Sequence, residues 1–117
     1  MKPVPPSYFR TLSRLTKAAE RESQALIKSL PKELRERIKG IPIRFEDKPS
    51  PSMIAAGMSD EAISATSRDG KEVVIFLMNL FERHGKRPGA FNEELRAVLM
   101  RKLAEMTGAE WTGVEPQ

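Results

Sequence analysis

One stretch of the chain, residues 92–108, constrains the fold most, because its two ends and its buried face are all specified. Its apolar residues recur at steps of three and four, which places them on one face of a helix: Phe91, Leu95, Val98, Leu99, Leu103 and Met106. Asn92 can cap the first turn, and Gly108 can adopt the left-handed conformation that ends a helix. The sequence therefore predicts an amphipathic helix over residues 92–108.

Proline, glycine and apolar spacing predict the other elements. We expect a long helix over residues 8–30, a short helix over 31–39, strands over 41–46 and 73–78, and a short helix over 79–83. Pro42 lacks the N–H group that a ladder needs, so the first strand is expected at a sheet edge. The second strand has no polar face and is expected to be buried on both sides.

Residues 53–66 have no single clear period, and both a short helix and an irregular lid fit them. The segment is rich in methionine and small residues. Such residues can line a shallow groove, but they more often form a satellite of the core.

The chain has 117 residues, of which 39% are hydrophobic and 31% charged, as in one globular domain. We expect an extended segment over residues 1–7, a single domain over 8–111 and a frayed tail over 112–117. No apolar run approaches the ~18 residues of a membrane helix, and the chain starts without a segment of signal-peptide type. We therefore expect a cytoplasmic protein with no membrane partner. The absence of cysteine excludes disulfides, thiolate catalysis and cysteine-ligated zinc.

Residues 98–108 read Val-Leu-Met-Arg-Lys-Leu-Ala-Glu-Met-Thr-Gly and resemble the active-site helix of the minimal zincin-like metallopeptidases, a family of small bacterial proteins. In that family the helix reads His-Glu-x-x-His, followed three residues later by Gly, with an Asp a few residues on. The resemblance extends over residues 15–111 through the order of the elements and the phrase Leu-Pro-Lys-Glu-Leu-Arg at residues 30–35. It implies an α+β fold in which a small mixed sheet packs against an N-terminal helix and a C-terminal former active-site helix.

The same resemblance implies that the zinc site is lost. Arg101 and Glu105 stand where the two histidines would be, and Lys102 stands where the catalytic glutamate would be. The later aspartate position falls near Trp111, with Glu110 as its acidic neighbour. A guanidinium stays protonated and has no lone pair to offer a metal, so no cofactor is expected.

Arg101 and Glu105 are four residues apart and can pair across one turn. The pair is either an exposed helical ion pair worth about 0.3 kcal/mol or a tie across the space that zinc would occupy in the family. Trp111 either packs back over the end of the helix or offers a contact to a partner.

Charge is unevenly distributed. Residues 1–50 hold 12 Lys and Arg against 6 Asp and Glu, a net of +6, whereas residues 51–117 hold 8 against 10, a net of −2, for a total of +4. The basic half can favour nucleic acid through the following residues: Arg14, Lys17, Arg35, Arg37 and Lys39. Because acidic residues are interleaved with them, an ordinary solvated helix face is the commoner explanation.

A polar loop groups His84, Lys86 and Arg87, which can contact an anion, although a solvated linker is the commoner role of such a loop. His84 is the only histidine, so a metal site would have to combine it with carboxylates such as Glu105 and Glu110.

The leading hypothesis is a non-catalytic zincin-like domain, a pseudo-metallopeptidase with a binding or structural role and a protein or peptide partner. The alternatives are a metal-dependent hydrolase with an unconventional site and a basic nucleic-acid-associated module. No nucleophile beside a base and no phosphate-binding glycine motif supports a conventional enzyme.

Overall fold

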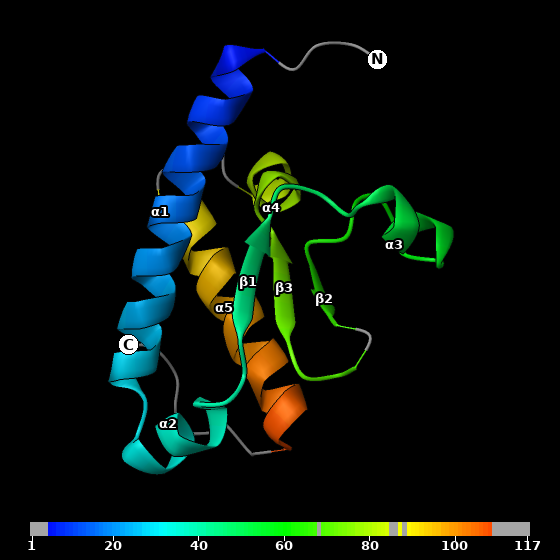
Figure 1. Cartoon of the computed structure of the whole chain (residues 1–117). Helices are drawn as coiled ribbons and strands as arrows, with labels where there is room; N and C mark the ends of the chain where they lie inside the picture. Colours follow the sequence, from blue (N-terminus) through cyan, green and yellow to red (C-terminus); the bar gives the residue numbers. More distant parts are fainter. Residues whose placement is uncertain (1–4, 68, 85–86, 88, 109–117) are drawn as a thin grey trace.

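The computed structural model describes residues 5–67, 69–84, 87 and 89–108. Within these residues the chain forms an α+β fold of five helices and one three-stranded mixed sheet (Figure 1). In chain order the elements are α1 (Pro6–Ser29), α2 (Lys32–Ile38), β1 (Ile43–Glu46), α3 (Pro51–Ala55), β2 (Ser64–Thr66), β3 (Val73–Phe76), α4 (Leu77–His84) and α5 (Ala90–Thr107). The expected α+β class, with a small sheet against an N-terminal and a C-terminal helix, is confirmed.

Strand β3 is the centre of the sheet, whose order is β1-β3-β2. It pairs in parallel with β1 and antiparallel with β2. All four of its residues are at most 1% exposed, which confirms the prediction of a strand buried on both faces. The Pro42 carbonyl accepts from the Val73 N–H at 3.0 Å, and β1 lies at the edge as its proline predicts.

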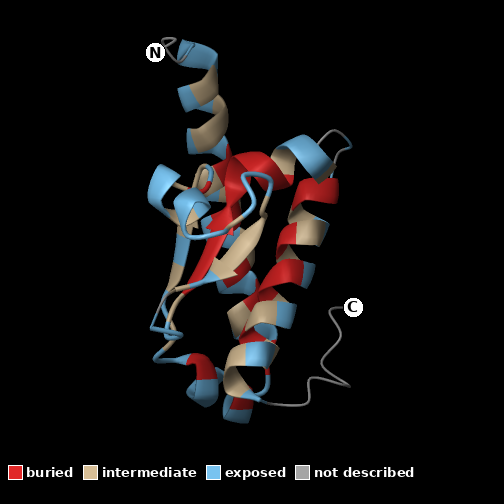
Figure 2. Cartoon of the chain, turned by 90° about the vertical axis from the view of Figure 1, so that its right-hand side faces the viewer, coloured by how far each residue is buried: buried red, intermediate tan, exposed pale blue. Residues whose placement is uncertain are grey.

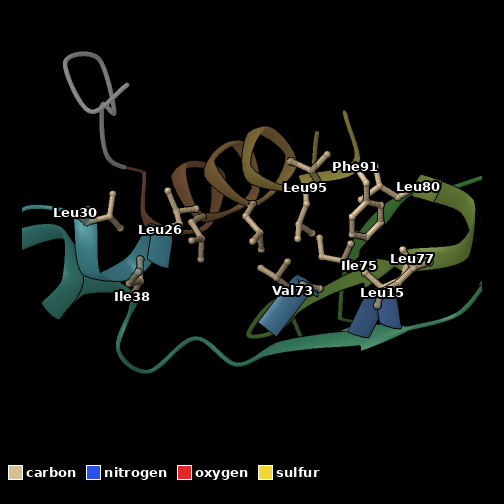
Figure 3. Packing of buried hydrophobic residues seen from close by; sticks show 14 of the residues in the cluster. Leu15, Leu26, Leu30, Ile38, Val73, Ile75, Leu77, Leu80, Phe91 and Leu95 are labelled. Atoms are coloured by element: carbon tan, nitrogen blue, oxygen red, sulfur yellow. The ribbon is translucent and has the colours of Figure 1, made fainter. Parts of the chain in front are cut away.

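Helices α1 and α5 pack on one face of this sheet. Val73 and Ile75 point toward α5, and Leu15 of α1 joins them in the same core (Figure 3). The residues predicted for the buried face of α5 are all buried except Met106, which packs against the core partly buried. Buried residues follow the inner side of α5 and exposed residues its outer side (Figure 2).

Several predicted boundaries are wrong. Helix α1 begins at Pro6, inside the segment 1–7 that was expected to be extended, and β1 begins at Ile43 rather than at residue 41. Helix α5 begins at Ala90 rather than Asn92, because Gly89 adopts a left-handed φ of 81° as the residue before the helix. This earlier start buries Ala90 and Phe91 in the first turn. Strand β3 ends at Phe76, and Leu77 already belongs to α4.

The ambiguous segment resolves into a helix and a strand. Ser50 caps α3 by accepting from the Met53 N–H at 3.3 Å. Strand β2, which the sequence does not predict, is closed onto β3 by a turn in which the Ser67 N–H donates to the Glu72 carbonyl at 2.8 Å. The Ser67 hydroxyl donates to Asp69 at 2.5 Å, and this bond is the main reason that the pKa of Asp69 is below its usual range.

Tyr8 and Asp47 join the start of α1 to the end of β1. The Tyr8 hydroxyl donates to the Asp47 carboxylate at 2.7 Å, and the Asp47 carbonyl accepts from the Met78 N–H at 3.0 Å. Three elements thus meet at one aspartate.

The contact between Tyr8 and Asp47 predicts a raised pKa for the Tyr8 hydroxyl and a loss of stability at high pH. Burial, followed by the bond to the Asp47 carboxylate, raises the pKa of Tyr8 to about 12. An unfolded tyrosine titrates near ~10, so the contact stabilises the fold below that pH, and the stabilisation is lost as pH rises from 10 toward 12. Tyr8 is the only tyrosine, so its ultraviolet absorbance reports this pKa directly. Asp47→Asn should lower the pKa while leaving part of the rise, because burial remains; an unchanged pKa in this variant would contradict the assignment.

Candidate functional site

The face of the sheet that points away from α1 and α5 carries a groove of about 650 Å³. Side chains alternate along a strand, so Val74 faces this groove whereas Val73 and Ile75 face the core. Strand pairing sets Val74 beside Arg44 on one side and Ala65 on the other, and this row forms the floor. The full lining is Arg44, Ser52, Met53, Ala56, Met58, Ala65, Thr66, Ser67 and Val74.

The wall of the groove comes from α3 and the residues after it. Met53, Ala56 and Met58 line this side. The loop that leads from this wall to β2 is held by buried Asn79 of α4, whose side-chain amide donates to the carbonyls of Asp60 and Ala62 at 2.8 Å each. Hydrogen bonds from α4 therefore hold the loop that follows the groove wall.

The chemistry of the groove is that of a binding surface. Among the described residues of the lining, the only charged side chain is that of Arg44, which is half exposed and pairs with Glu46 at 3.4 Å and Glu72 at 3.2 Å. The rest of the lining consists of hydroxyls, methyl groups and two thioethers, and methionine adapts its shape easily to an apolar partner. The lining residues that the structure describes include no His, Asp, Glu, Lys, Cys or Tyr that could work as a general acid or base.

Beside the groove, β2 has a free edge. Ser67 pairs with Glu72 by a backbone bond, and the Phe76 N–H donates to the Ile63 carbonyl. In an antiparallel ladder bonded pairs alternate with non-bonded pairs, so Ser64 and Thr66 turn their N–H and carbonyl groups away from β3. No described residue forms a backbone hydrogen bond with these outward-facing groups of Ser64 and Thr66.

The positions that the resemblance assigns to a former active site lie elsewhere. Arg101 and Glu105 are exposed on α5, Lys102 is partly exposed, and none of the three lines the groove. Glu105 pairs with Lys102 at 3.5 Å, not with Arg101, because a residue three positions away on the helix is also within reach. Glu110 and Trp111 lie outside the described residues.

The structure does not bring together the proposed metal set. His84 Nε2 is 3.9 Å from Glu94 Oε2 in the first turns of α5, and Glu105 follows eleven residues later. At ~1.5 Å per residue the two carboxylates are about 16 Å apart along the helix, too far to share an ion with His84. Among the described residues there is no group of three or more His, Cys, Asp or Glu that could hold a metal.

The surroundings of the polar loop argue against the predicted anion site at His84, Lys86 and Arg87. His84 and Arg87 line a hollow of about 190 Å³ together with Glu93 and Glu94. These two carboxylates share the hollow with Arg87 and would repel an anion there, which weakens the interpretation as an anion site. Lys86 lies outside the described residues.

The basic residues proposed for nucleic acid divide into two places. Arg14 and Lys17 are exposed on α1, whereas Arg35, Arg37 and Lys39 are exposed at α2, near the opposite end of α1 (Figure 1). Arg37 is 3.8 Å from Glu33. The set as proposed is therefore not one cluster.

Comparisons of the chain with protein-family models, with curated proteins and with solved structures found no match. In the part of the chain that the structure describes, no helix is both long and apolar enough to span a membrane.

The exposure of the former active-site positions predicts a contrast in stability. Leu99 is fully buried, so Leu99→Ala should lower the free energy of unfolding by about 2–5 kcal/mol. Arg101→Ala and Glu105→Ala should each change it by less than about 0.5 kcal/mol, because both side chains are exposed. Urea unfolding followed by circular dichroism measures all three. A loss above ~1.5 kcal/mol for Arg101→Ala would instead favour a structural tie at this position.

Proposed function

We propose that the chain is a non-catalytic domain on a zincin-like scaffold, and that it binds an extended segment of a partner protein in the groove beside β2. The observation that carries this proposal is the juxtaposition of an apolar groove with a free strand edge. An added strand would obtain backbone hydrogen bonds from the edge and side-chain contacts from the groove.

The edge offers a small set of bonds in a defined register. Ser64 and Thr66 each present a donor and an acceptor to an incoming strand. Side chains of that strand would alternate between the groove and solvent, so every second residue of the peptide would face Ala65 and the methionines. Small or medium apolar residues suit these alternate positions.

The size of the groove agrees with this use. Its volume of about 650 Å³ lies within the ~300–1,000 Å³ that is common for binding sites. In the minimal zincin-like family, the region after the first strand helps to wall the substrate cleft. Here the corresponding region supplies Met53, Ala56 and Met58 to the wall of the groove, which supports a binding role for this region.

The residue types at the former active-site positions support a binding role over catalysis. Arg101 and Lys102 are cations that repel a divalent ion, and Glu105 already pairs with Lys102. The groove lies on the face of the sheet away from α5 and does not include these positions, and binding there needs contacts but not a metal.

A peptide-display selection tests the groove. Peptides selected from a random library on the wild-type protein should bind Ala65→Glu at least about tenfold more weakly, because a carboxylate would project onto the apolar floor. The matched control is Ala55→Glu, which places the same charge on an exposed position of α3 outside the lining. Failure to select any peptide, or equal binding by the two variants, would count against the proposal.

The strand edge has its own test. Thr66→Pro removes an N–H that points away from β3, so the sheet should keep its ladder while an added strand loses one bond. We expect the selected peptides to bind this variant several-fold more weakly and to bind Thr66→Val, which keeps the N–H, as tightly as they bind the wild type.

Metal analysis tests the non-catalytic assignment itself. Stoichiometric zinc in protein purified without a metal-affinity tag would overturn that assignment.

A further inference from the structure

Helix α1 carries a straight row of cations on the side opposite the core. This basic stripe consists of Arg10, Arg14, Lys17, Arg21 and Lys28, all exposed. At ~100° per residue the five fall within a sector of about 60°, on the opposite side of the helix from the buried residues Leu15, Ala19 and Leu26. At ~1.5 Å per residue the stripe is about 27 Å long.

The stripe is not neutralised. None of its five residues forms an ion pair with another described residue. Glu22 lies on the flank of the helix and is occupied by Arg96 at 2.7 Å, and Glu20 is about 60° or more around the helix from every stripe residue. Arg14 also lies 5.9 Å from the Phe81 ring centroid, a contact that orients the guanidinium without cancelling its charge.

We propose that the basic stripe is a docking surface for duplex DNA, contacted through its phosphates without reading of bases. Complementary charge carries the inference: five unpaired cations in a row face a polymer with one charge every ~3.4 Å along each strand. Consecutive stripe residues rise by about 4.5–10.5 Å along the helix, so each can meet a different phosphate. Contacts of this kind position a protein on DNA but carry no sequence information.

The surroundings of the stripe favour duplex DNA over other polyanions. An amphipathic membrane helix buries its apolar face in lipid, but the apolar face of α1 is already used in the core, and Phe9 is its only exposed large apolar residue among those described. Binders of single strands stack bases on aromatic rings, and the stripe has none. A helix of ~10–12 Å diameter fits the major groove of B-DNA, whereas the major groove of duplex RNA is too narrow.

The position of α1 leaves the stripe open. The helix runs along the outside of the molecule, on the other side of the sheet from α3 and the groove wall (Figure 1). DNA on α1 and a peptide in the groove would therefore use different elements. The DNA proposal does not rest on the peptide proposal, and either can fail alone.

Fluorescence anisotropy with a labelled mixed-sequence duplex tests the stripe across a range of salt concentrations. Wild-type protein should bind at low salt, and its log K should fall against log salt with a slope of about −4.5 if the five cations each meet a phosphate. Lys17→Gln combined with Arg21→Gln should make this slope shallower by about 2 and weaken low-salt binding at least about tenfold. Both positions are exposed, so circular dichroism should be unchanged.

The charge-matched control is Lys71→Gln combined with Arg101→Gln, which removes the same two charges from exposed positions off the stripe. It should keep the wild-type slope. Three results would overturn the proposal: no binding at low salt, an equal loss in the control variant, or stripe-dependent binding that is tighter to duplex RNA or to anionic lipid vesicles than to duplex DNA.

Discussion

The burial of β3 on both faces is the constraint on which the rest of the structure depends. Val73 and Ile75 face the helices, and Val74 faces the groove from the same backbone. A fully buried side chain of this size contributes roughly 1.5–3 kcal/mol, and β3 provides such burial on both of its sides while β1 and β2 satisfy its hydrogen bonds. The centre of the groove floor, Val74, is therefore held by the same strand that anchors the core.

Features with a local period could be predicted from the sequence. The buried face of α5 and the central strand follow from the spacing of apolar residues within one segment. Strand β2 could not be predicted, because Ser64–Thr66 has no apolar alternation and its strand conformation comes from pairing with β3. The start of α5 was missed for a related reason: Asn92 has capping chemistry, but the burial of Phe91 favours an earlier turn at Gly89.

The candidate sites follow the same division. The row Arg44–Val74–Ala65 joins three strands that are distant in the sequence, so only the order β1-β3-β2 reveals it. The ion-pair partner of Glu105 is also set by side-chain geometry, because both Arg101 and Lys102 are within reach of it on the helix. By contrast, the basic stripe needs only the helical period. Only Arg14 and Lys17 of it were among the residues predicted for nucleic acid, because Glu20 and Glu22 interrupt the stripe in sequence although they lie on other sides of α1.

The two proposed surfaces differ in electrostatics as well as in place. Among the described residues Arg44 is the only cation of the groove lining, and it pairs with two carboxylates, so this part of the surface attracts a polyanion less than the stripe does. The stripe has no such counterions among the described residues, and it belongs to the half of the chain with a net charge of +6. Long-range attraction would therefore orient DNA toward α1 and away from the groove. Because the apolar side of α1 is anchored by Leu15, Ala19 and Leu26, the stripe charges can change without disturbing the sheet that forms the groove floor.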